Sequence, residues 1–223
     1  MPAPLELQGT FPALTTPFSG DGVDLPALRR HAEYLLAEGV NGLVPCGTTG
    51  EAATLSRAEK RQVIRSVVEV SAGQCPVIAG VGTNSTSDTI TYAGDALEVG
   101  ADALLVVTPY YNKPPQDGLY AHFMAVVEAH DAPVILYDVP GRTAVHMAPE
   151  TVARLAKHPK VVALKDATGD MRTGSLVASS SIKDISLLSG DDYSALPLMC
   201  IGGRGVISVV ANVDPRRTVE MVN

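Results

Sequence analysis

The sequence contains no tryptophan and only three phenylalanines, and aromatic residues make up 4% of its 223 residues. Apolar residues of all kinds nevertheless reach 46%. A sizeable core therefore has to be built from valine, leucine, isoleucine and alanine. An aliphatic core of this kind suits a parallel α/β protein, whose buried strands are aliphatic on both faces.

Basic residues are scarce relative to acidic ones: 17 lysines and arginines stand against 24 aspartates and glutamates, a net charge of −7. Phosphate backbones repel an acidic chain, so nucleic acid is not an expected partner. No apolar run approaches the roughly 20 residues of a membrane helix, and residues 1–9 lack the pattern of a secretion signal. Three widely spaced cysteines do not indicate a disulfide framework, so we expect a cytoplasmic protein with no membrane partner.

The chain instead alternates short aliphatic runs with helical patterns, which indicates βα units. Eight runs are expected to be strands: 11–16, 42–46, 76–81, 103–108, 133–137, 161–165, 185–189 and 205–210. The first expected helix begins after the cap Asp24 and ends at Gly39, and the second opens with the capping box Ser56–Glu59. Further helices are expected at 87–99, 118–130, 149–157, 171–180 and 195–200, and the last one opens at Pro215.

Eight strand–helix pairs without a linker predict an α/β fold, the closed (β/α)₈ TIM barrel, in a single domain over residues 1–223. A doubly wound open sheet, which usually has fewer strands, is the alternative. The eighth helix is expected to be incomplete because the chain stops at Asn223, and this would leave apolar barrel surface uncovered.

In such barrels the functional site lies at the carboxyl ends of the strands. Polar residues gather at five of these ends, in 47–51, 108–112, 137–142, 165–166 and 189–192. Hydroxyls, phenols, a guanidinium and an amine are therefore predicted to converge on one face of the barrel.

Lys165 is the most informative of these residues. It ends the aliphatic run 161–164, so its stem begins inside the barrel mouth. Burial disfavours the ammonium form and leaves more free amine to attack a carbonyl. The alternative is a lysine whose side chain reaches out to solvent. The other polar groups predicted on the same face favour the interpretation of Lys165 as a nucleophile.

Three further features suit that chemistry. Tyr137 can donate and accept a proton, the Thr48–Thr49 turn offers hydroxyls and backbone N–H groups to a carboxylate, and Arg142 could hold a second carboxylate with its bidentate fork. Each has an ordinary alternative when taken singly: a tyrosine that fills the barrel top, a plain βα turn and a solvated arginine.

Other features are not expected to form sites. The glycine-rich segment 202–205 precedes the last strand and so lies on the wrong face for a phosphate loop. Asp191 and Asp192 are expected to begin a helix, and no metal is predicted because no histidine pair has ligand spacing.

Several segments together resemble the dihydrodipicolinate synthase / N-acetylneuraminate lyase family over nearly the whole chain. They are TTPF at 15–18, GTTGE at 47–51, TPYYN at 108–112, YDVPGRT at 137–143, KDATG at 165–169, GVIS at 205–208 and ANV at 211–213. The resemblance implies a pyruvate-dependent, class I aldolase-type lyase in which Lys165 forms a Schiff base. The protein's own amine would supply the electron sink by forming the Schiff base, so no metal or organic cofactor is implied.

The double threonine and Arg142 match the branch of the family that condenses pyruvate with L-aspartate-4-semialdehyde in diaminopimelate and lysine biosynthesis. That match implies a homo-oligomer, a dimer of dimers, in which the neighbouring subunit supplies Tyr111. The residues implied in catalysis are Lys165, Tyr137, Thr49 and Tyr111, and those implied in substrate binding are Thr48, Thr49, Arg142, Gly190 and Ile207.

The resemblance also implies an effector site for lysine, which Asn84, Asp88 and Tyr110 match. Arg57 and Lys60 stand where feedback-inhibited relatives often carry histidines. Two cations would repel a lysine effector, so we expect weak or no inhibition by lysine.

Members of this family continue into a C-terminal helical region that is absent after Asn223, which is expected to affect stability and assembly. Asp138 stands where many relatives have asparagine, and we expect its side chain to point away from the imine. Two other functions remain open. One is a lyase for a sugar-derived 2-oxo acid of the 2-keto-3-deoxygluconate or N-acetylneuraminate type, which would have less use for Arg142, and the other is an inactive pyruvate-binding fragment.

Overall fold

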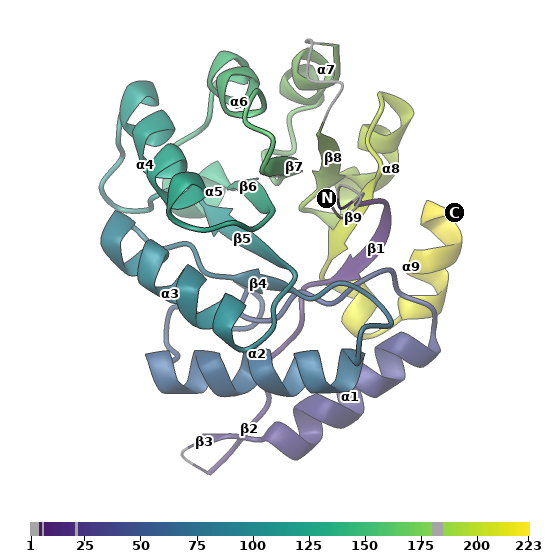
Figure 1. The fold of residues 1–223 in the computed structure, drawn as a ribbon. Helices are drawn as coiled ribbons and strands as arrows, with labels where there is room; N and C mark the ends of the chain where they lie inside the picture. Colours follow the sequence, from purple (N-terminus) through teal and green to yellow (C-terminus); the bar gives the residue numbers. More distant parts are fainter. Residues whose placement is uncertain (1–4, 6, 21, 180–184) are drawn as a thin grey trace.

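The computed structural model describes residues 5, 7–20, 22–179 and 185–223. Seven parallel strands form a curved sheet in the order β1-β9-β8-β7-β6-β5-β4, with the helices on its outer side (Figure 1). These strands are β1 (Gly9–Pro12), β4 (Ile78–Gly80), β5 (Ala103–Val107), β6 (Val134–Asp138), β7 (Val161–Asp166), β8 (Ser186–Ser189) and β9 (Gly205–Ser208). The short strands β2 (Phe18–Ser19) and β3 (Gly22–Val23) form a separate antiparallel pair, which the sequence did not predict.

The predicted strand at 42–46 lies between the two edges of this sheet and forms isolated bridges in place of a regular strand. Val44 pairs with Ala13 beyond β1, and Leu43 pairs with Val77 before β4. Pro45 has no backbone N–H to donate, which explains why the ladder is interrupted here. The segment still joins the edge strands β1 and β4, so eight segments surround the barrel interior as predicted.

The helices follow the strands in the expected alternation. They are α1 (Leu25–Ala37), α2 (Arg57–Ser71), α3 (Thr86–Glu98), α4 (Gln116–Ala129), α5 (Pro140–Thr143), α6 (Pro149–Leu155), α7 (Met171–Ser179), α8 (Asp192–Cys200) and α9 (Pro215–Val222), with a 3₁₀ turn η1 (Val210–Asn212). Asp24 caps α1, and Ser56 and Glu59 form the predicted capping box of α2. The short helix α5 was not predicted, and the predicted end of α7 at Ser180 lies outside the described residues.

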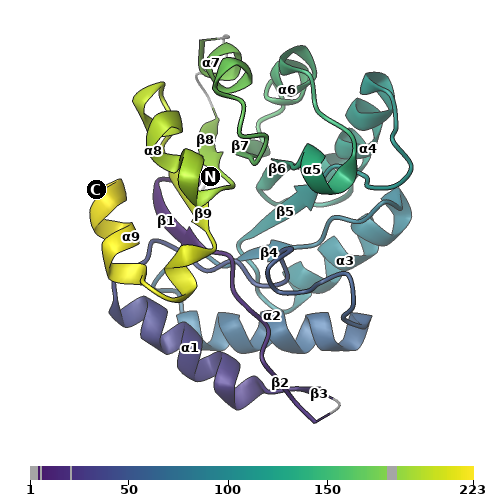
Figure 2. The same cartoon turned by 180° about the vertical axis from the view of Figure 1, so that it is seen from behind.

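The two views agree that the helices succeed one another around the outside, with α9 beside α1 (Figures 1 and 2). Arg216 of α9 pairs with Glu38 at the end of α1, with Nε 2.9 Å from Oε2. Within the described ranges, no helix has the length and apolarity needed to cross a membrane.

Side chains alternate along each strand between the barrel interior and the helix layer. Leu105, Ile135 and Ala163 belong to a buried cluster inside the barrel, whereas Leu136 and Leu164 pack in the larger cluster against the helices. Because successive strand residues face opposite sides, positions 137 and 165 share the interior side, and positions 138 and 166 share the helix-facing side. This alternation decides which polar groups can meet at the mouth of the barrel.

Candidate active site

Lys165 lies near the carboxyl end of β7 on the interior side, and the residue is only 4% exposed. Burial lowers the pKa of its ammonium to about 8, although the carboxylates of Asp191 and Asp192 act in the opposite direction. At pH 8 about half of the amine is therefore unprotonated, compared with about 0.3% for a lysine of ordinary pKa. The site thus provides an amine that can attack a carbonyl near neutral pH.

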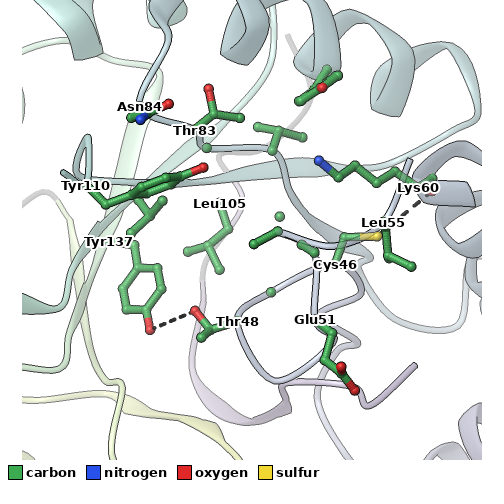
Figure 3. A pocket seen from close by; sticks show the side chains of 18 of the residues that line it. Cys46, Thr48, Glu51, Leu55, Lys60, Thr83, Asn84, Leu105, Tyr110 and Tyr137 are labelled. Atoms are coloured by element: carbon green, nitrogen blue, oxygen red, sulfur yellow. Dashed lines mark hydrogen bonds between the residues drawn. The ribbon is translucent and has the colours of Figure 1, made fainter. Parts of the chain in front are cut away.

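Tyr137 lies directly beside this amine. It pairs with Lys165 in the β6–β7 register, and the lysine Nζ is 4.0 Å from the centroid of its ring. Its hydroxyl is 3.5 Å from the Oγ1 of Thr48 (Figure 3). Burial raises the pKa of the phenol, while the contact with Thr48 and the charge of Arg142 lower it. The phenol therefore stays protonated at neutral pH and can pass a proton to and from a neighbouring group.

A cavity of about 460 Å³ opens in front of Tyr137. Lys165 is not among the described residues that line this cavity, and its Nζ lies 4.0 Å from the centroid of the Tyr137 ring. Figure 3 shows the cavity from close by. Its wall includes the predicted catalytic residue Tyr137 and the predicted substrate-binding residues Thr48 and Arg142. The predicted effector residues Asn84, Asp88 and Tyr110 line the same cavity. Within one chain, both groups of residues thus border one continuous space.

The threonine turn follows the segment 42–46. Cys46 before it and Glu51 after it both have a φ of 56°, and the hydroxyl of Thr16 donates to the carbonyl of Gly50 at 2.7 Å. It is the hydroxyl of Thr48 that meets Tyr137, and Thr49 is half-buried beside it. The turn therefore holds a hydroxyl at the cavity wall next to the phenol.

Gly190 follows β8 and lies against the stem of Lys165. A Cβ at this position would be 2.6 Å from the Cβ of Ala167 and 3.1 Å from the Cε of Lys165. Ile207 of β9 is fully buried in the interior cluster. Gly190 therefore leaves the space that the lysine stem occupies, and Ile207 packs in the same interior cluster as Tyr137.

Tyr111 does not face this site in the single chain. The residue is 88% exposed and its backbone has a φ of 71°, in the left-handed region that a bulky residue rarely adopts. The side-chain amide of Asn112 donates to the carbonyl of Asn84 at 2.9 Å and ties down the loop beside it. The loop thus presents an aromatic side chain outward.

The two cations of the predicted effector site have different surroundings. The guanidinium of Arg57 binds both carboxylate oxygens of Asp95, at 2.5 and 2.9 Å, whereas Lys60 lines the cavity with its Nζ 4.2 Å from the centroid of the Tyr92 ring. Burial lowers the pKa of Lys60. Of these two cations, only Lys60 therefore borders the cavity. Arg57 is instead paired with Asp95, a residue 38 positions further along the chain.

Asp191 and Asp192, the two aspartates after β8, lie at the start of α8 and also interact with residues outside that helix. Asp191 occupies the N-cap position of α8 as predicted, but its side chain makes no capping hydrogen bond and its charge acts on Lys165. Asp192 accepts hydrogen bonds from the hydroxyl of Ser208 and the backbone N–H groups of Val209 and Val210. Among the described residues, no group of three or more His, Cys, Asp or Glu side chains is arranged to hold a metal ion.

Fold and site together define a (β/α)₈ barrel enzyme with a buried lysine of lowered pKa beside a tyrosine, and a lysine of this kind suits Schiff-base chemistry. The model of the dihydrodipicolinate synthetase family matches residues 6–223. A 4-hydroxy-tetrahydrodipicolinate synthase from Anaeromyxobacter sp. (strain Fw109-5) is 51% identical over 217 residues, which cover 97% of this chain and 74% of that protein. The chain belongs to the dihydrodipicolinate synthetase family.

Solved structures agree with this assignment. The dihydrodipicolinate synthase from Aquifex aeolicus superimposes with a TM-score of 0.95 at 43% identity, over 97% of this chain and 74% of that one. The chloride-inhibited enzyme from Acinetobacter baumannii, solved in complex with pyruvate, superimposes with a TM-score of 0.94 at 45% identity, over 96% and 74% of the two chains.

Proposed function

We propose that this chain catalyses the Schiff-base-dependent condensation of pyruvate with L-aspartate-4-semialdehyde to 4-hydroxy-tetrahydrodipicolinate, a step of diaminopimelate and lysine biosynthesis. Membership of the family and the names of the relatives support this reaction. The observation that carries the proposal is the buried Lys165, whose pKa burial lowers to about 8, with its Nζ 4.0 Å from the centroid of the Tyr137 ring.

The reaction begins with the free amine of Lys165, which attacks the keto carbon of pyruvate. The resulting carbinolamine loses water to form an imine, and loss of a methyl proton converts the imine into a nucleophilic enamine. Tyr137 is placed to donate and accept these protons, and Thr48 meets its hydroxyl. We assign Thr49 and Tyr111 to the same proton relay.

The hydroxyls and backbone N–H groups of the Thr48–Thr49 turn hold the pyruvate carboxylate. The enamine carbon then attacks the aldehyde of the second substrate, and attack of that substrate's amino group on the imine carbon closes the ring and releases Lys165. Arg142 is on the cavity wall, where its guanidinium can hold the second carboxylate through two hydrogen bonds. The protonated imine that Lys165 forms with pyruvate accepts the electron pair of the broken C–H bond, so the proposed steps use no organic cofactor.

The proposed relay requires a second copy of the chain. Tyr111 is turned outward, 88% exposed, on a loop with a strained backbone. We propose that it reaches the site of a neighbouring subunit in a homodimer, and that two such dimers form a tetramer. The residues 1–223 would then act as one barrel domain in each subunit.

Replacing Arg142 with alanine tests the choice of second substrate. The KM for L-aspartate-4-semialdehyde should rise by roughly 10- to 100-fold, because a carboxylate would lose a charge-assisted, bidentate partner. Steady-state kinetics measure this change, and the rate of borohydride-trapped pyruvate adduct formation should change little. Unchanged kinetics with the semialdehyde would contradict the assignment and favour a lyase for a sugar-derived 2-oxo acid.

Weak or absent inhibition by lysine is a second expected result. Lys60 places a cation on the wall of the cavity that Asn84, Asp88 and Tyr110 also line, and it would repel the ammonium of lysine. A titration with lysine should leave the wild-type rate unchanged at concentrations up to about 1 mM, well into the range where an effector of ordinary affinity binds. Strong inhibition at micromolar lysine would show that Lys60 does not exclude the ligand.

A further inference from the structure

Asp138 ends β6 next to Tyr137, but its side chain lies on the helix-facing side and points away from the imine position, as expected from the sequence. The residue is 2% exposed. Its Oδ2 accepts a hydrogen bond from the Nδ1 of His146 at 2.7 Å and another from the backbone N–H of Met147 at 3.1 Å. A buried carboxylate thus ties the end of the strand to a segment eight residues further along the chain.

That segment belongs to the Arg142 loop, which we define as residues 139–148, including α5. The loop begins beside Asp138, carries Arg142 on the cavity wall and returns to Asp138 at His146 and Met147. Gln116 of α4 holds its far end: the side-chain amide donates to the carbonyl of His146 at 2.8 Å, and its oxygen accepts from the N–H of Ala148 at 3.0 Å.

Among these contacts, the Asp138–His146 hydrogen bond is the one that joins two titratable side chains. The helices over this face contribute the neutral Gln116 and Thr151, which bind each other at 2.7 Å. Asp166 of β7 is paired with Asp138 in the sheet register and is also buried. His146 and Asp166 are thus the titratable groups that act on Asp138 in the described part of the chain, and they act in opposite directions.

We propose that Asp138 and His146 are positioning residues: their hydrogen bond holds the Arg142 loop in the conformation that presents Arg142 to the carboxylate of the second substrate, and protonation of Asp138 loosens it. This rests on the proposed function. Burial, with a smaller contribution from the charge of Asp166, raises the pKa of Asp138 to about 6, against the opposing effects of His146 and the Met147 N–H. The charge-assisted bond is therefore present above about pH 6 and is lost as the pH falls through that value.

The test compares wild type with Asp138→Asn, Asp138→Ala and His146→Gln between about pH 5 and pH 8, a range that spans the titration of the carboxyl group. The wild-type KM for L-aspartate-4-semialdehyde should rise about tenfold from the upper to the lower end, the equivalent of one such hydrogen bond. Asp138→Asn keeps an oxygen for the Met147 N–H but cannot titrate, so its KM should be nearly independent of pH. Asp138→Ala and His146→Gln should show a raised KM throughout.

His158→Gln, which changes a histidine beyond the Arg142 loop, serves as the matched control and should behave as wild type. Hydrogen exchange of the loop peptide provides a readout that does not depend on turnover: exchange should accelerate at low pH in wild type and not in Asp138→Asn. A KM profile and loop exchange in Asp138→Asn and His146→Gln that match those of wild type would overturn the proposal. Failure of the proposed function would look different: pyruvate would be trapped on Lys165 while no variant, wild type included, turned over the semialdehyde at any pH.

Discussion

Replacing Lys165 with alanine should reduce turnover by roughly 10⁴- to 10⁶-fold, the range expected when a nucleophile is removed from groups that act as a unit. In the wild type, the rate of imine formation should rise with pH and reach half of its maximum near pH 8, the pKa to which burial lowers the amine. Single-turnover kinetics with pyruvate measure both effects. Residual turnover within tenfold of wild type would rule out Lys165 as the nucleophile.

The buried charge of Lys165 should also destabilise the fold at neutral pH. The pKa of Lys165 falls from an ordinary 10.5 to about 8, so the unfolded chain binds more protons between these values and stability rises as the pH increases through that window. Lys165→Met, which removes the charge and keeps the stem, should therefore raise the free energy of unfolding at pH 7 by up to about 3 kcal/mol. Denaturant unfolding measures the change, and Lys157→Met, at an exposed lysine, serves as the control.

Replacing Gly190 with alanine should slow imine formation by about 100-fold, because small displacements of a reacting group have effects of that size. The added Cβ would lie 2.6 Å from the Cβ of Ala167 and 3.1 Å from the Cε of Lys165, so the lysine stem or the β8 loop has to move. We also expect a loss of about 1–3 kcal/mol in stability from overpacking.

Gly141→Ala provides the matched control for this substitution. Gly141 is next to Arg142 in α5, and a Cβ there would meet nothing within 4 Å. Its rate of imine formation should stay close to that of wild type. If Gly190→Ala also formed the imine at the wild-type rate, the lysine stem would not depend on the space that Gly190 leaves.

The fold follows from the sequence wherever periodicity extends over enough residues. Aliphatic runs predicted the strands, and the capping residues predicted where α1 and α2 begin. The hairpin of β2 and β3 and the four-residue helix α5 are too short to produce a period. The segment 42–46 has the aliphatic composition of a strand, but Pro45 lacks the backbone N–H that a regular ladder needs at that position.

The candidate site was predictable to the extent that it depends on strand ends. The alternation along β6 and β7 places Tyr137 and Lys165 on the same interior side, and a residue after a strand end, such as Thr48, lies near them. Contacts between distant segments were not predictable in this way. The pairing of Arg57 with Asp95 and the bond between Asp138 and His146 depend on loop conformations and helix packing that no local pattern encodes.

The most direct test of the central claim is to incubate the purified protein with pyruvate and borohydride, measure its intact mass and map the modified peptide. Reduction converts the imine into a stable secondary amine. We predict one pyruvate adduct per chain, on Lys165, in a sample that circular dichroism shows to be folded. No adduct, or an adduct on another lysine in such a sample, would contradict the assignment of Lys165 as the Schiff-base residue.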